Sequence, residues 1–210
     1  MNVDQVTSID ELFDCWKKDP KNQGKGFYPD GVTSARGNTQ KDKDEVDVLF
    51  VLKESHIDPD KPNDGTFWFD SSPDAPVRKC FMAKFQKMLD RLKEQDSTLD
   101  IDKFGYMNLN KQGGGSTTDN RKLKDYTDKY AVYIKKQIQI HSPKIIICFG
   151  RGCYPIVSDF CESVSAKAPK AFQIVGSPKF KSSTVSLFGK KIILMEMRHP
   201  SAFGRYAYQP

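Results

Sequence analysis

Long apolar runs are missing from this 210-residue chain, and their absence excludes one class of protein. No stretch approaches the roughly 18 to 20 consecutive apolar residues that a transmembrane helix needs, so we expect no membrane association. Residues 1–14 carry acidic side chains and lack an apolar core, so they do not predict a signal peptide. We therefore expect an intracellular protein, cytoplasmic or, in a bacterium, associated with the nucleoid.

Paired cysteine motifs are also missing. The five cysteines are an odd number, and none forms a Cys-x-x-Cys pair. This usage predicts reduced thiols and no disulfide framework. The glycine run at 113–115 is not followed by the Lys-Ser/Thr of a nucleotide-binding P-loop, so we do not expect a P-loop.

The composition that is present is typical of one soluble globular domain, with 38% hydrophobic and 29% charged residues. We expect a single domain over residues 1–210, with an N-terminal helix and a long polar loop within residues 1–45. Charge is uneven: residues 1–105 carry a net −5 and residues 106–210 a net +11. A one-sided positive field favours phosphate-rich partners, although a solvated lysine-rich surface is the plainer alternative.

Four helices are predicted from capping and from apolar spacing. Ser8 and Glu11 form a capping box in front of an apolar face at Leu12, Phe13 and Trp16. The polar residues 21–45 predict a loop with room for a short strand or two. The predicted helices span residues 9–18, 77–94, 119–141 and 153–163.

Strands alternate with these helices. Short apolar runs at 46–52, 104–110, 144–149 and 191–197 predict buried strands, and Gly189-Lys190 predicts a hairpin between 184–188 and 191–197. Alternating strands and helices are typical of an α/β protein. We expect three layers, α/β/α, around a central, mostly parallel, four-stranded sheet.

Polar residues follow three of the predicted strands. The first strand runs into Glu54, Ser55 and His56, the second carries Asn108 and Lys111, and the last ends in Arg198, His199 and Ser201. In an open α/β sheet the ligand sits beyond the carboxyl ends of the strands, so we expect these groups to share one crevice. The alternative is that each strand ends in an ordinary turn, with His199 bonded only to backbone.

Read in order, these segments resemble the uracil-DNA glycosylase superfamily. The segments are residues 46–56, Met107-Asn108-Leu109-Asn110-Lys111 with Asn120-Arg121, the Pro-Lys-apolar-Gly stretch 143–150, and His199-Pro200-Ser201. The resemblance implies a catalytic loop after the first strand, an Asn at 108 that reads the base, and a His-Pro-Ser loop that enters the minor groove. It also implies base excision in DNA repair.

The first motif departs from the pattern of that family. Where the family has Gly, then Glu or Gln, then Asp or Asn, then Pro, this chain has Lys53-Glu54-Ser55-His56. A hydroxyl therefore occupies the position of the water-activating acid, which leaves Glu54 or Asp58 for that role. Family branches with an iron–sulfur cluster have a paired cysteine motif near the N-terminus. This chain lacks it, so we expect no cluster, no other metal and no cofactor.

The chemistry that suits these residues is hydrolysis of an N-glycosidic bond. Glu54 would activate water, His199 would stabilise the departing base, and Asn108 would read the Watson–Crick edge of uracil. One of the aromatic side chains Phe67, Trp68 or Phe69 would stack on the flipped base. Further substrate contacts are expected from Ser55, Lys111, Arg198 and Ser201, and phosphate contacts from Lys111, Arg121, Arg151, Lys179 and Arg205.

Two functions follow from this sequence. The first is a monomeric DNA glycosylase that flips and removes uracil or another deaminated base from single- or double-stranded DNA. The second is a non-catalytic nucleic-acid or nucleobase-binding module on the same fold, which Ser55 in place of an acid favours.

Overall fold

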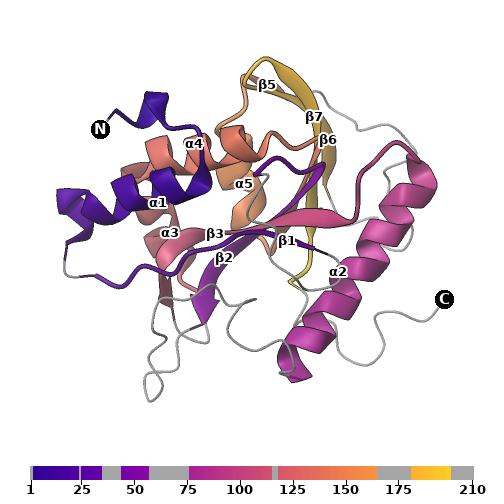
Figure 1. Cartoon of the computed structure of the whole chain (residues 1–210), viewed down its shortest axis with the longest axis horizontal. Helices are drawn as coiled ribbons and strands as arrows, with labels where there is room; N and C mark the ends of the chain where they lie inside the picture. The colour runs from indigo at the N-terminus through magenta and orange to yellow at the C-terminus, as the bar shows by residue number, and fades with distance from the viewer. Residues whose placement is uncertain are drawn as a thin grey trace.

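The structure is a computed structural model that describes residues 2–23, 25–34, 44–56, 76–114, 118–164 and 181–199. The side chains of Ser34, His56 and residues 76–80 are outside this description. Within it, the chain forms an α/β protein built on one mixed sheet (Figure 1).

Seven strands form the sheet, in the order β1-β3-β2-β4-β7-β6-β5. The four central strands β3, β2, β4 and β7 are parallel to one another, and β1, β6 and β5 add antiparallel pairs at the two sides. The predicted parallel core is confirmed, but the four-stranded sheet is wrong because three further strands extend it. The strands are β1 Gly31–Ser34, β2 Val48–His56, β3 Lys103–Gly114, β4 Ile145–Phe149, β5 Ser163–Val164, β6 Ser182–Leu187 and β7 Lys190–Met197.

Five α-helices cover the two faces of the sheet. Helices α1 (Ile9–Lys18), α3 (Asn120–Lys129), α4 (Ala131–His141) and α5 (Cys153–Ser158) pack on one face, and α2 (Pro76–Gln95) packs on the other (Figure 1). Two 3₁₀ helices, Val3–Gln5 and Pro20–Asn22, flank α1.

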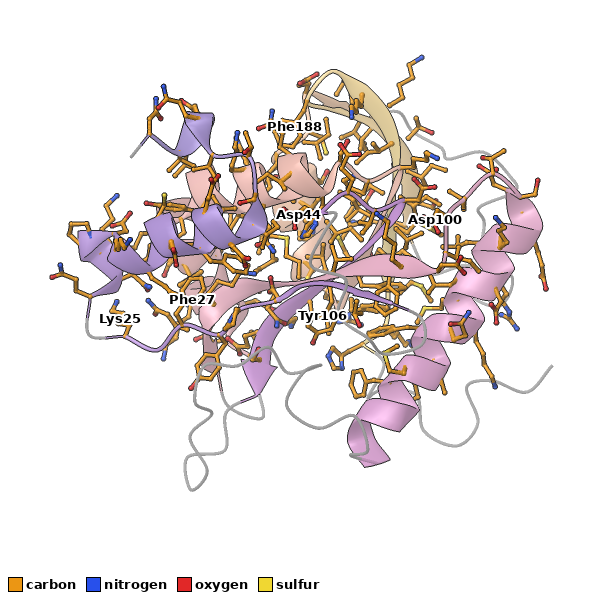
Figure 2. All side chains as sticks on the ribbon, in the orientation of Figure 1. Lys25, Phe27, Asp44, Asp100, Tyr106 and Phe188 are labelled. Carbon is orange, nitrogen blue, oxygen red and sulfur yellow. The ribbon has the colours of Figure 1, made fainter. Side chains whose placement is uncertain are left out.

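Alternation along the buried strands supplies both cores. On β2, Leu49 and Val51 join the core under α1, α3, α4 and α5, whereas Phe50 and Leu52 join the core under α2. Successive side chains of a strand point to opposite faces, so one apolar run serves two layers. Figure 2 shows the side chains that fill the space on each side of the sheet, with Tyr106 labelled near α2.

The N-cap predicted at Ser8 is confirmed, and Glu11 reaches back as expected, although to the residue before the cap. The Ser8 hydroxyl accepts the Glu11 N–H at 3.3 Å, and the Glu11 carboxylate accepts the Thr7 N–H at 3.2 Å. A cap of this kind stabilises a helix by roughly 1 kcal/mol. The predicted apolar face, with Leu12, Phe13 and Trp16, is buried.

The single helix predicted over residues 119–141 is wrong, because the structure has two helices that meet at Tyr130. Tyr130 leaves the helical conformation, with φ −112° and ψ 19°. Its ring is fully buried near Trp16, and its hydroxyl donates to the Lys21 carbonyl at 2.7 Å. Those tertiary contacts lie over 100 residues away in sequence, so local periodicity does not reveal them.

Three smaller differences concern loops and ends. Strand β1 forms inside the predicted polar loop, as one of the short strands allowed there. Helix α5 ends at Ser158, and Ser163 joins β5 instead of the helix predicted to include it. The hairpin is confirmed, but its turn lies at Phe188 and Gly189, both with positive φ (52° and 71°). Positive φ at both central residues matches a type I′ turn.

Candidate functional site

The carboxyl ends of the four parallel strands lie along one edge of the sheet and carry most of the predicted site. Strand β2 lies between β3 and β4, and β7 follows β4. Because neighbouring strands are spaced about 4.8 Å apart, β2 and β7 are separated by about 10 Å. Glu54 on β2 and His199 after β7 therefore lie at the same edge of the sheet, with β4 between their strands.

Glu54 is half-buried and fixed by its neighbours on β3. It lies opposite Asn110, and its carboxylate accepts a hydrogen bond from the Asn110 side-chain amide at 3.0 Å. A Cβ at Gly114 would collide with the Glu54 carboxylate, so this glycine makes the close approach possible. The carboxylate is thus oriented without a counter-charge among the residues described here.

Asn108 is 2% exposed and presents one unused acceptor. Its side-chain amide N–H donates to the Ser55 hydroxyl at 3.0 Å. Within the described part of the chain, its Oδ1 is buried and has no hydrogen-bond partner. A buried acceptor without a donor is destabilising, so a ligand N–H that donates to this oxygen would form a favourable hydrogen bond.

Lys111 does not reach the surface where a substrate or phosphate would meet it. Its side chain is fully buried and forms an ion pair with Asp30, and its Nζ also donates to the Asn108 carbonyl at 2.8 Å. Burial lowers the pKa of Lys111, and the Asp30 carboxylate opposes that shift. The expected substrate contact at Lys111 is therefore replaced by an internal ion pair beneath Asn108.

His199 is half-buried directly after β7. Its ring meets the Phe81 ring of α2 edge-on, with centroids 6.0 Å apart. Burial lowers the pKa of His199, and the positive charges of Lys53 and Lys84 lower it further. The imidazole is accordingly neutral at pH 7, a state that can donate one N–H and accept at the other nitrogen. Arg198, beside it, is exposed.

Lys53 also lies at this edge, although no role for its side chain was expected from the sequence. Its Nζ donates to the Asn120 side-chain oxygen at 2.9 Å. Its stem lies over Gly150, where an added Cβ would come within 3.2 Å of Lys53 Cε, and Gly152 leaves room for Asn120. The Gly-Arg-Gly turn after β4 was the sequence signal for a close approach of this kind.

The remaining site predictions fall in three groups. Phe67, Asp58, Lys179, Ser201 and Arg205 lie outside the described residues, and only the backbone of His56 is described. Arg121 and Arg151 are exposed near the same edge. The structure thus brings Glu54, Ser55 and Asn108 together on adjacent strands.

The described residues contain no group of three or more His, Cys, Asp or Glu side chains that could hold a metal ion. Three cysteines whose side chains are described, Cys148, Cys153 and Cys161, are free thiols. Burial raises the pKa of the Cys148 and Cys153 thiols, so neither is an activated nucleophile. No helix in the described ranges is both long and apolar enough to cross a bilayer.

Neither the protein-family models nor the curated proteins compared with this chain give a match.

Proposed function

We propose that this chain is a uracil-DNA glycosylase-like enzyme that binds DNA, flips a uracil or another deaminated base out of the stack, and hydrolyses its N-glycosidic bond. The proposal is supported by the motifs at the ends of β2, β3 and β7, and by the parallel order β3-β2-β4-β7 that brings those ends to one edge. The positive charge of residues 106–210 favours a phosphate-rich partner.

The observation that carries the proposal is the buried Oδ1 of Asn108, which has no hydrogen-bond partner among the described residues. Deamination turns the N3 of cytosine and the N1 of adenine, both acceptors, into the N–H donors of uracil and hypoxanthine. A buried acceptor pairs with those donors and leaves the parent bases unpaired. Sites that rely on such a bond discriminate strongly, because the wrong ligand leaves a buried polar group unsatisfied.

The chemistry assigned to Glu54 and His199 balances without a further reactant. The bond between C1′ and the base nitrogen breaks, and its electron pair leaves with the base. Glu54 stabilises the cationic sugar and takes a proton from the water whose oxygen bonds to C1′. His199, neutral at pH 7, donates its N–H to a carbonyl oxygen of the anionic base.

A second function, nucleobase or nucleic-acid binding without cleavage, is favoured by two observations. Ser55 stands where the family has an acid, and its hydroxyl is bonded to Asn108. The Glu54 carboxylate is already bonded to Asn110, which would hold back its action as a base. Both functions use Asn108 to read the base and differ in the roles of Glu54 and His199.

The test is incubation of the purified protein with oligonucleotides that contain uracil, hypoxanthine or xanthine, scored for abasic sites. We expect cleavage of at least one, and a fall of roughly 10²- to 10⁴-fold in the Glu54→Gln variant with little change in DNA affinity. Asp47→Asn, a carboxylate replaced at the opposite edge of the sheet, is the matched control and should cleave normally.

Wild-type protein that binds these oligonucleotides but releases no base would support the binding module instead. Protein that binds none of them more tightly than undamaged DNA would remove both functions.

A further inference from the structure

We infer that the buried Asp30–Lys111 ion pair is a positioning device that holds the backbone of Asn108, and so sets the direction in which Asn108 reads a base. The inference rests on the proposed function, because it assigns to this pair a part in base selectivity. It gives no part in bond cleavage to either residue.

The ion pair lies just beyond the end of β1 and binds backbone groups of β3 that β1 does not reach. Strand β1 pairs with β3 only as far as Gly31 opposite Tyr106, so Asn108 has no strand on that side. There the Asn108 N–H donates to the Asp30 carboxylate at 2.6 Å, and the Asn108 carbonyl accepts from Lys111 Nζ at 2.8 Å. Two side chains thus satisfy the backbone groups that a longer β1 would have paired.

The pair is itself held in place from several directions. The Asp30 carboxylate accepts from the Gln137 side-chain amide at 2.7 Å. Lys111 Nζ lies 5.4 Å from the centroid of the Phe13 ring and 5.7 Å from that of Trp16. Both charged side chains are completely buried. Their atoms therefore have little freedom to move independently of Asn108.

Stability alone does not account for charges at this position. A buried ion pair is often no more stable than apolar side chains of similar volume, whereas loss of one partner is strongly destabilising. Apolar side chains, however, can neither accept the Asn108 N–H nor donate to its carbonyl. What the ion pair adds is a fixed backbone beneath a side chain whose Oδ1 must meet one ligand atom.

The test compares variants that separate stability from selectivity. Lys111→Met leaves the Asp30 carboxylate buried without a cation, so we expect a large loss of stability. The double variant Asp30→Asn with Lys111→Met removes both charges, keeps an acceptor for the Asn108 N–H, and removes the donor to its carbonyl. We expect it to recover most of the lost urea midpoint but not the base selectivity.

Selectivity is measured as the ratio of affinities for uracil- and cytosine-containing oligonucleotides, in a Glu54→Gln background so that no base is released. We expect the ratio to fall roughly 10- to 100-fold in the double variant. Leu92→Ala, a cavity under α2, is the control. It should lower the urea midpoint and leave the ratio unchanged.

A double variant that recovers both stability and the wild-type ratio would overturn the inference, since the pair would then be structural only. If the unmutated site shows no preference for uracil, the proposed function fails and a separate readout decides this inference. That readout is the side-chain amide resonances of Asn108 in nitrogen-15 NMR spectra. Unchanged resonances in the double variant refute positioning, and shifted or broadened ones support it.

Discussion

Both ends of the four parallel strands carry polar residues, but the contacts of these residues differ between the two ends. At the amino ends, an open pocket of about 400 Å³ is lined in part by charged side chains, and two of them, Asp47 and Lys144, form an ion pair. Asp47 accepts from Lys144 Nζ at 2.9 Å and from the Asp100 N–H at 2.7 Å. At the carboxyl ends, the half-buried Glu54 and Ser55 accept hydrogen bonds from asparagine amides, and the buried Oδ1 of Asn108 has no partner among the described residues.

This difference shows why volume alone does not locate a site. The amino-end pocket has room for a small ligand, yet the Lys144 side chain of its ion pair with Asp47 is 58% exposed, and ion pairs so open to solvent contribute little. At the carboxyl edge, hydrogen bonds fix the orientation of Asn108 and Glu54 although this leaves a buried acceptor of Asn108 unpaired among the described residues. Such an arrangement is expected where a ligand supplies the missing hydrogen bond. Substitutions at matched positions of the two ends test this contrast.

The largest effect is expected from His199→Ala. Loss of one hydrogen-bond donor to the departing base should slow cleavage of the preferred oligonucleotide by roughly 10²- to 10³-fold. The measurement is the single-turnover rate, with a melting curve to show that the variant is folded. Lys190→Ala at the amino ends removes an exposed side chain bonded to Ser142 and should leave the rate unchanged. Equal rates for wild type and His199→Ala would remove His199 from the mechanism.

A smaller effect is expected from Lys53→Met in DNA binding. The Lys53 ammonium has only a neutral partner, Asn120, among the described residues, so its charge is available to a phosphate. If it contacts one phosphate, the slope of log affinity against log salt should fall by about 0.7 to 0.9. Lys191→Met, which removes an exposed lysine at the amino ends, should keep the wild-type slope. A slope unchanged by Lys53→Met would place Lys53 outside the DNA interface.

Much of the fold could be predicted because its signals are local. Short segments of sequence determine the N-cap of α1, the apolar strands and the hairpin, and each lies close to its predicted place. Strands of two to four residues, such as β1 and β5, carry too little pattern to be recognised. The break at Tyr130 depends on a bond to Lys21, 109 residues away.

The site could be predicted only by residue type and strand end. Glu54, Ser55 and Asn108 were expected at one edge, and the structure brings them together. The burial of Lys111 could not be foreseen, because its partner Asp30 is 81 residues earlier in a polar segment that gives no sign of entering the core. For the same reason the sequence could not show that the Asn108 amide donates to the Ser55 hydroxyl on another strand.

The smallest expected effect concerns His141, at the end of α4. It lies near the amino ends of the strands, yet like Asn108 it has a buried polar atom without a partner among the described residues. Its ring is fully buried, Nδ1 donates to the Asp44 carbonyl at 2.7 Å, and in the described structure Nε2 has no partner. Burial lowers the pKa of His141, an effect that Lys111 adds to and that Asp44 and Asp30 oppose. The folded protein therefore keeps this imidazole neutral to a lower pH than the unfolded chain does.

The sign of the resulting pH dependence follows from proton binding. Above about pH 6.5 the imidazole is neutral in both states and has no effect on stability. As the pH falls through 6.5 toward the lowered pKa of the folded state, the unfolded chain binds a proton first and the free energy of unfolding decreases. Urea titrations between pH 7.5 and 5.5 should show this loss, and His141→Gln should show less of it, because a glutamine does not titrate. His199→Ala in parallel separates the contribution of the other histidine with a lowered pKa. If wild type and His141→Gln lose stability equally over this range, then the pKa of His141 is the same in the folded and unfolded states. The burial of its unpaired Nε2 would then have no effect on the pH dependence of stability.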